Sequence, residues 1–285
     1  MPFIHHKLGK TYYRSKGPKR SIPLVCLHGG PGGSHHYFEK MLGFFPDRRV
    51  IIYDQAGSGA STRTRKDKWT IKHMVAELEI LIDKWGLEEY HLLGSSWGGT
   101  LAIEYYLRTK DPRIKSLVFS SSLLSEPMWA KDARRLIGKF PAKHRKALLR
   151  SLRTDETDFP GYKEASDLYT KRHLFRGKKR KPNPKIKKAF NEELYNYMWG
   201  PSEFHANGTL KGWDRSKDLH KIKVPTLYIC GRFDESTPES NRHFAKLTPD
   251  AKLKVIPKAS HSMARENPKA LKRELGKFLE GVDGK

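Results

Sequence analysis

The sequence predicts an α/β protein whose doubly wound, mostly parallel sheet is interrupted by a helical insertion. Three observations support this fold class. Short apolar runs without strict alternation are typical of strands buried on both faces. Amphipathic helical patterns separate these runs, and the strand–helix order stops between about residues 125 and 215 before it resumes. We therefore expect a core formed by residues 1–124 and 216–285 and a helical cap formed by residues 125–215 of this 285-residue chain.

Seven segments carry the strand predictions. The first, residues 3–15, alternates weakly and ends at Gly17-Pro18, which suggests the start of a hairpin. The other six are short apolar runs that we expect to form buried strands: 22–27, 49–53, 90–93, 114–119, 225–230 and 253–256. Beyond the last of them, a final amphipathic helix is expected over residues 271–279.

Two further helices are predicted between the early strands. Residues 71–85 carry apolar side chains three and four positions apart, with Thr70 placed to cap the start and Gly86 to end the helix. The second helix should follow Trp97. It should stop before Asp111-Pro112, because the residue before a proline disfavours the helical conformation.

The charge of the chain is unevenly distributed. There are 56 Lys and Arg against 31 Asp and Glu, a net charge of +25, and residues 131–190 hold 20 of the basic and 6 of the acidic residues. Within this region, residues 177–185 combine lysines with prolines and predict an exposed loop. Such a patch favours polyanions, which keeps a nucleic-acid-binding protein as an alternative. No aromatic residues are interleaved as in a stacking platform, so a solvated charged surface is the simpler interpretation.

The compartment can also be predicted. No apolar stretch approaches the roughly 20 residues that a membrane-spanning helix needs. The first residues lack the apolar run of a secretory signal. The two cysteines, Cys26 and Cys230, lie inside apolar runs, so we expect buried thiols rather than a disulfide framework. These features predict a cytoplasmic protein.

One segment has the pattern of a catalytic serine. Residues 94–98 read Gly-Ser-Ser-Trp-Gly and match G-x-S-x-G between the predicted strand 90–93 and the helix that follows. At such a sharp turn the serine hydroxyl is exposed and the flanking residues approach closely, so only very small ones fit. Ser95 competes with Ser96 for this role, but the spacing to both glycines selects Ser96 as the nucleophile.

A serine nucleophile needs a general base, and the base needs a carboxylate that orients it. In α/β hydrolases the chain order is serine, acid, histidine, each on a turn after a strand. Asp234 follows the strand 225–230, and His261 follows the strand 253–256, so both occur in that order. Glu235 competes with Asp234 for the orienting role, and the spacing alone does not decide between them.

Acyl transfer also requires two backbone N–H donors for the developing oxyanion. One should belong to Trp97, the residue after the nucleophile. The other should come from the glycine-rich segment 28–32, where a backbone without side chains can approach the substrate. We select Gly30 as this second donor.

Four segments together are distinctive. They are His28-Gly29-Gly30-Pro31-Gly32, Asp54-Gln55-x-Gly57-x-Gly59-x-Ser61, Gly94-x-Ser96-Trp97-Gly98-Gly99-Thr100-Leu101 and, in the insertion, Met198-Trp199-Gly200-Pro201-Ser202-Glu203-Phe204. The combination resembles the proline iminopeptidase family of α/β hydrolases and the related tricorn-interacting aminopeptidase. The matching pieces extend from about residue 20 to about residue 265, nearly the whole chain.

The resemblance implies an exopeptidase that removes an N-terminal residue, often proline, from short peptides with a free amine. It implies no cofactor. It also implies that acidic residues bind the substrate's α-amine, and by motif position these are Glu203 and Glu235. An ammonium group in a partly desolvated pocket needs such a partner. Which of the two glutamates contacts the amine stays open.

Several aromatic residues are expected near the site. Tyr37, Phe38, Trp97 and Trp199 could form an apolar pocket for a proline ring, and they could equally belong to the hydrophobic core. The sequence does not determine the oligomeric state.

Two alternatives to this interpretation concern the chemistry. An esterase or amino-acid amidase would use the same triad without paired amine-binding glutamates.

A metal site is suggested by His5-His6 and His35-His36. We expect no metal, because adjacent histidines on a strand point to opposite faces and no carboxylate or cysteine cluster accompanies them.

Overall fold

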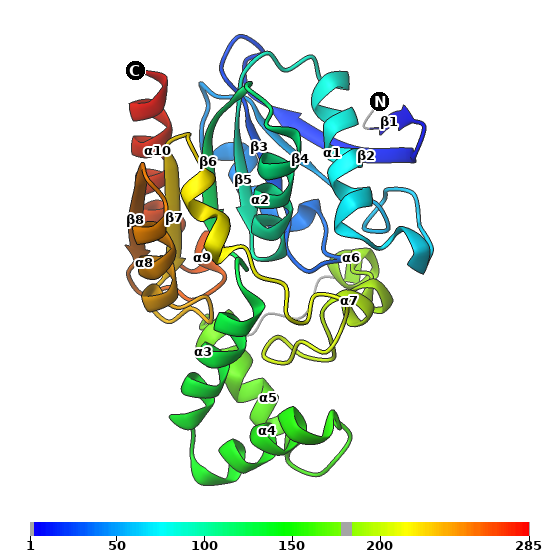
Figure 1. Cartoon of the computed structure of the whole chain (residues 1–285), viewed down its shortest axis with the longest axis vertical. Helices are drawn as coiled ribbons and strands as arrows, with labels where there is room; N and C mark the ends of the chain where they lie inside the picture. The colour runs from blue at the N-terminus through cyan, green and yellow to red at the C-terminus, as the bar shows by residue number, and fades with distance from the viewer. Residues whose placement is uncertain (1–2, 178–183, 285) are drawn as a thin grey trace.

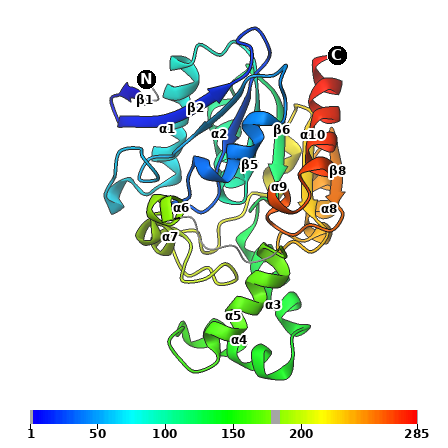
Figure 2. The same cartoon turned by 180° about the vertical axis from the view of Figure 1, so that it is seen from behind.

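The sheet has the predicted class. The computed structural model describes residues 3–177 and 184–284, and within them eight strands form one sheet in the order β1-β2-β4-β3-β5-β6-β7-β8 (Figures 1 and 2). The strands are β1 (Phe3–His6), β2 (Gly9–Lys16), β3 (Leu24–Leu27), β4 (Val50–Tyr53), β5 (Tyr90–Ser95), β6 (Ile114–Ser120), β7 (Thr226–Gly231) and β8 (Ala251–Ile256). The pairs β1–β2 and β2–β4 are antiparallel, and all the other neighbouring pairs are parallel. This confirms the mostly parallel sheet. The predicted hairpin differs in its turn, because residues 3–16 form two strands that reverse at Lys7-Leu8, and no hairpin turn forms at Gly17-Pro18, since the other neighbour of β2 is β4.

Both faces of the sheet are covered, which explains the apolar runs. In β3, Val25 and Leu27 pack in one hydrophobic cluster, while Leu24 and Cys26 pack in a second cluster on the other face. Consecutive side chains of a strand point to opposite faces, so a strand covered on both sides must be apolar throughout. Cys26 and Cys230 are fully buried free thiols, as predicted.

Helices form a layer on each face. The first cluster includes side chains of α1 (Ile71–Lys84), α2 (Trp97–Thr109) and α8 (Pro238–Leu247), and the second includes side chains of the 3₁₀ helix η1 (His35–Gly43), α9 (Met263–Glu266) and α10 (Pro268–Asp283). Two short 3₁₀ helices, η2 (Lys66–Lys68) and η4 (Ser216–Lys221), lie in connections. Among the described residues, none of the helices combines the length and the apolar character that crossing a bilayer requires.

The predicted helix ends are confirmed. The Thr70 side chain accepts a hydrogen bond of 3.2 Å from the backbone N–H of His73 at the start of α1. Gly86 follows the end of that helix with a φ of +63°, in the left-handed region that favours glycine. Helix α2 ends at Thr109, before Asp111-Pro112.

A largely helical segment connects β6 to β7. It contains α3 (Glu126–Gly138), α4 (Ala142–Thr154), α5 (Tyr162–Tyr169), the π-helical turn η3 (Thr170–Leu174), α6 (Pro184–Ala189) and α7 (Glu192–Met198). Helices α3, α4 and α5 project beyond the sheet (Figure 1) and enclose a hydrophobic cluster of their own. Side chains of α7, such as Leu194 and Met198, instead belong to the first cluster of the core. The segment occupies the range predicted for the cap, whose boundaries stay a prediction.

The lysine-rich stretch 177–185 is only partly described. Residues 178–183 lie outside the described residues, so the loop prediction is not tested there. Pro184 and Lys185 differ from the prediction, because they begin α6. A proline is well suited to the first turn of a helix, since its missing N–H has no acceptor there.

Candidate active site

Ser96 lies at a strained turn between β5 and α2. Its φ of 54° and ψ of −122° are unusual for a residue with a side chain. The surrounding glycines are required by close contacts: a Cβ on Gly94 would lie 2.2 Å from the carbonyl oxygen of Gly98, and a Cβ on Gly98 would lie 2.0 Å from that of Leu27. The competing Ser95 is fully buried at the end of β5, whereas Ser96 is partly exposed. The structure therefore favours Ser96 as the accessible hydroxyl.

Asp234 and His261 are joined directly. Asp234 follows β7 and His261 follows β8, and their Oδ1 and Nδ1 atoms are 2.9 Å apart. Asp234 is also held by three further donors, which are the Ser121 hydroxyl at 2.5 Å and the backbone N–H groups of Gly231 at 3.1 Å and Ser236 at 3.0 Å. The carboxylate is therefore fixed in one orientation, and its position against Nδ1 leaves the other imidazole nitrogen for proton transfer.

The charge around His261 favours its protonated form. Burial lowers the pKa of His261, but the carboxylates of Asp234 and Glu203 more than offset this, so the pKa is raised above its usual value. The hydroxyl of Tyr37 donates to the backbone carbonyl of His261 at 3.2 Å and so helps to hold this loop.

Ser96 and His261 share one edge of the sheet, because both follow the carboxyl ends of parallel strands. Among the described residues no hydrogen bond joins the Ser96 hydroxyl to the imidazole. In enzymes without substrate such hydrogen bonds are often long and shorten in the substrate complex. The two residues are thus brought to the same edge, while their direct contact stays a prediction.

The two predicted oxyanion donors belong to segments beside Ser96. Trp97 is the first residue of α2, where backbone N–H groups lack acceptors within the helix. Gly30 has a φ of +115°, which a residue with a side chain rarely adopts. A Cβ on the neighbouring Gly29 would lie only 3.0 Å from the Cβ of Ser96, so the glycine-rich loop passes directly beside the nucleophile.

Gln55, which the sequence analysis quoted only as part of a motif, connects these two loops. Its side-chain amide donates to the carbonyl of His28 at 3.0 Å, and its side-chain oxygen accepts from the Trp97 indole N–H at 2.9 Å. Asp54 fixes the same region from the other side, since it accepts from the backbone N–H groups of His35 at 2.6 Å and Ala60 at 2.8 Å. The Asp-Gln segment therefore positions the glycine-rich loop after β3 against the turn at Ser96.

Two glutamates create an acidic environment beside His261. Glu235 is 1% exposed, neither of its carboxylate oxygens has a hydrogen-bond partner among the described residues, and Oε1 lies 3.8 Å from Nδ1 of His261. Burial and the charges of Glu203 and Asp234 raise the pKa of Glu235 well above its usual value. Burial also raises the pKa of Glu203. The carboxylates of Glu203 and Glu235 therefore share the charge of one imidazole with Asp234, and a further cation in this environment would stabilise their ionised forms.

A cavity of about 290 Å³, which we call the acidic cavity, is lined by Glu203 together with Tyr169 and Tyr195. The hydroxyls of both tyrosines are buried and have no hydrogen-bond partner in the part of the chain that the structure describes. The Tyr169 hydroxyl lies close enough to Glu235 to act against the raised pKa of this carboxyl, but without the geometry of a hydrogen bond. Sequence analysis did not identify these tyrosines, because no strand end or motif marks them.

The aromatic predictions divide into two groups. Trp199 is 4% exposed and its indole N–H donates to the carbonyl of Ser202 at 2.9 Å, so it shapes the segment that carries Glu203. Phe38 is 2% exposed in the second hydrophobic cluster, which leaves its ring little surface for a substrate. Tyr37, in contrast, is 37% exposed beside the His261 loop.

Trp129, on α3, was missed by sequence analysis. Its ring lies edge-on to His261 at a centroid distance of 6.1 Å, and its indole N–H donates to the carbonyl of Glu203 at 3.1 Å. It also contacts Trp199, with ring centroids 6.0 Å apart. An amphipathic helix gives no sequence signal for a contact with a residue more than 100 positions away, and only the placement of α3 over the sheet edge creates it.

The argument against a metal at His35-His36 was wrong in its geometry. These residues lie in the 3₁₀ helix η1 rather than on a strand, their ring centroids are 4.1 Å apart, and Glu39 lies within reach of both. The Arg14 guanidinium donates to Glu39 at 3.0 Å, and His35 Nδ1 is bonded to Asp54 at 2.8 Å. Glu39 thus already has a cationic partner, which disfavours a second cation at this cluster.

Known proteins resemble this chain along most of its length. Residues 22–268 match the α/β hydrolase fold family. The proline iminopeptidase of Heyndrickxia coagulans is 38% identical over 263 residues, 91% of either chain. That of Clostridium botulinum is 35% identical over 99% of this chain and 98% of its own. The crystal structure of the Mycobacterium smegmatis proline iminopeptidase superposes with a TM-score of 0.89 at 31% identity, covering 99% of this chain and 98% of that one.

Proposed function

This chain belongs to the proline iminopeptidase family of the α/β-hydrolase fold, and we propose that it is a serine aminopeptidase that releases an N-terminal residue from short peptides. The preferred residue is proline. The substrates are short peptides with a free N-terminal amine, and the residues of this chain carry the reaction without a cofactor.

The observation that carries this proposal is the pair of glutamates near His261, of which Glu235 is buried and Glu203 is half-buried. Neither carboxylate oxygen of Glu235 accepts a hydrogen bond from a described residue, and Glu203 borders the acidic cavity. Buried carboxylates in this state are costly unless a cation joins them. A primary α-ammonium group, or the secondary ammonium (NH₂⁺) of an N-terminal proline, supplies that cation and places the first peptide bond one residue away, near Ser96.

The catalytic steps follow from the positions of the groups. Ser96 attacks the carbonyl carbon of the N-terminal residue while His261 accepts the hydroxyl proton. Asp234 holds the imidazole through Nδ1 and stabilises the imidazolium that forms. The backbone N–H groups of Gly30 and Trp97 stabilise the oxyanion. His261 then protonates the leaving amine. Water next attacks the acyl-enzyme while His261 accepts its proton, and His261 returns that proton to the Ser96 oxygen as the acyl group leaves.

The test of the proposed activity is hydrolysis of proline β-naphthylamide by the wild type and by Ser96→Ala. Loss of the nucleophile should lower kcat by at least about 10³-fold, because the remaining groups cannot form an acyl-enzyme. The matched control is Ser95→Ala, which removes the neighbouring buried hydroxyl. Equal rates for the wild type and Ser96→Ala would exclude this mechanism.

An esterase or amino-acid amidase would use the same triad, and acetylation of the substrate amine separates the two activities. N-acetyl-proline β-naphthylamide lacks the cation that the glutamates bind. An aminopeptidase should lose most of its activity on it, since a buried ion pair is removed. Retained activity would instead favour the esterase or amidase.

We also propose that the enzyme is cytoplasmic. Both cysteines are fully buried free thiols, an arrangement suited to a reducing compartment. Fractionation of the source cells followed by the naphthylamide assay tests this, and activity confined to a secreted fraction would contradict it.

A further inference from the structure

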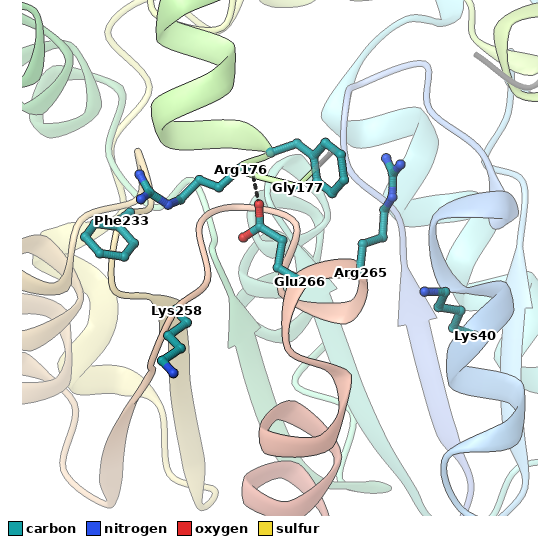
Figure 3. A pocket seen from close by; sticks show the side chains of 8 residues that line it. Lys40, Arg176, Gly177, Phe233, Lys258, Arg265 and Glu266 are labelled. Carbon is teal, nitrogen blue, oxygen red and sulfur yellow. Dashed lines mark hydrogen bonds between the residues drawn. The ribbon is translucent and has the colours of Figure 1, made fainter. Parts of the chain in front are cut away.

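A second, larger cavity lies close to the His261 loop. It measures about 710 Å³ and is bounded by segments that are far apart in the sequence (Figure 3). Phe175 and Arg176 follow η3, Phe233 follows β7, and Arg265 and Glu266 belong to α9. It shares no lining residue with the acidic cavity. We call it the basic pocket.

Among the residues that the structure describes, four cationic side chains line this pocket against a single carboxylate. The cations are Lys40, Arg176, Lys258 and Arg265. The carboxylate, Glu266, already accepts hydrogen bonds from the Ser260 hydroxyl at 2.9 Å and from backbone N–H groups of the surrounding loops. The Glu266 carboxylate thus joins the backbone segments of the pocket wall through its hydrogen bonds. The pocket keeps a net positive charge that attracts an anionic ligand.

Aromatic rings support the two arginines, and Arg176 Nη1 makes one long hydrogen bond of 3.5 Å to the carbonyl of Arg172, which leaves its other guanidinium donors for a ligand. The Arg176 guanidinium stacks over the ring of Phe233 at 3.9 Å, and that of Arg265 stacks over Phe175 at 4.1 Å. Stacking occupies the face of a guanidinium, while its N–H groups lie in the plane and point outward. Such an arrangement suits the planar, bidentate recognition of a carboxylate.

The pocket is built from the same loops as the catalytic residues. The backbone N–H groups of His261 and Ser262 donate to the carbonyls of His173 and Leu174, each at 3.0 Å, and this chain continues directly into Phe175. Phe233 immediately precedes Asp234. Two wall residues, Phe233 and Lys258, therefore lie one and three positions along the chain from Asp234 and His261, which places the pocket against the loops that carry these residues.

We propose that the basic pocket binds the C-terminal carboxylate of the leaving peptide, so that the enzyme is selective for short peptides with a free carboxyl terminus. This inference rests on the proposed aminopeptidase function. The acidic cavity then holds the ammonium end of a substrate and the basic pocket holds its carboxylate end. A short peptide with a free amine and a free carboxylate is therefore complementary to both cavities. A peptide that ends in a C-terminal amide is complementary only to the acidic cavity.

The experiment compares Pro-Gly, Pro-Gly-Gly and Pro-Gly-Gly-Gly, each as the free acid and as the C-terminal amide, by release of proline. For the wild type, kcat/KM should favour the acid by about threefold to tenfold at the length that reaches the pocket, the effect of one or two partly exposed ion pairs. The preference should lie mainly in KM and should decline as ionic strength rises, because salt screens exposed charges.

The variant Lys258→Gln/Arg265→Gln removes two of the four cations and should bring the acid-to-amide ratio close to one. Both side chains are exposed, so their replacement spares the core. The matched control is Lys277→Gln, an exposed lysine on α10 outside the pocket lining, which should keep the wild-type ratio.

The outcomes separate this inference from the function on which it rests. If proline β-naphthylamide is hydrolysed in a Ser96-dependent manner but the wild type shows no preference for acids at any length, the carboxylate pocket is refuted and the aminopeptidase stands. A preference that survives unchanged in the double variant also refutes the pocket, because the carboxylate then binds elsewhere. Absence of naphthylamide hydrolysis would instead reject the proposed function.

Discussion

Asp234 and Glu235 are neighbours in the chain and lie in opposite electrostatic settings. Asp234 is hydrogen-bonded to the Ser121 hydroxyl, to two backbone N–H groups and to Nδ1 of the His261 imidazole. Glu235 is equally buried, and neither of its carboxylate oxygens has such a partner among the described residues. The difference separates two tasks. A group that orients the base must be fixed before substrate arrives, whereas a group that binds a cationic substrate must remain unpaired until then.

The replacement Asp234→Asn should cause the largest change in this comparison. An amide cannot hold the imidazole in the same tautomer, so kcat for proline β-naphthylamide should fall by about 10⁴-fold with little change in KM. Circular dichroism should show an intact fold. If Glu235→Gln lowers kcat as much and Asp234→Asn is mild, the two neighbours have exchanged the roles assigned to them.

Glu235→Gln should act on binding rather than on the proton transfer. Removing the unpaired carboxylate should lower kcat/KM for proline β-naphthylamide by about 10²-fold, mainly through KM, because a desolvated ion pair to the substrate is lost. The variant Glu88→Gln removes an exposed carboxylate remote from the site and should have no effect. An unchanged KM for Glu235→Gln would show that the glutamate does not bind the amine.

The same residue predicts a pH effect on stability. The pKa of Glu235 is raised in the folded protein, so above the ordinary glutamate pKa of about 4.3 the folded state holds more protons than the unfolded state. The contribution of this residue to stability therefore falls as pH rises toward its folded pKa. Thermal melts should show Glu235→Gln gaining Tm relative to the wild type at pH 8 and gaining less or nothing at pH 4. A gain that is larger at pH 4 would reverse the sign and contradict the assignment.

Trp129→Phe should cause the smallest of these changes. The ring contact with His261 is largely kept, but the hydrogen bond to the Glu203 carbonyl is lost, which costs about 1 kcal/mol, or about fivefold in kcat/KM. Phe159→Leu alters an aromatic residue in the part of the cap that packs on Tyr162, and it serves as the control. An effect of Trp129→Phe below that of the control would show that the indole N–H does not position Glu203.

Much of the fold was predictable because its signals are local. Apolar runs mark β3 through β7, since side chains of a strand covered on both faces must all be apolar. The weaker β8 is a partly exposed edge strand, and its side chains alternate. His35-His36 was misjudged because a short 3₁₀ helix has no strong periodicity, so strand geometry was assumed there.

The order of Ser96, Asp234 and His261 along the chain, and the turns on which they lie, were determined by the sequence itself. The close approach of backbones at Gly94 and Gly98 and the shared edge of parallel strands are consequences of local residue type and chain direction. The tertiary structure alone decided which buried groups lack partners and which distant residues meet. Trp129 over His261, the tyrosines beside the glutamates and the arginines stacked around the basic pocket depend on how the cap packs, because burial and contact are properties of the assembled fold.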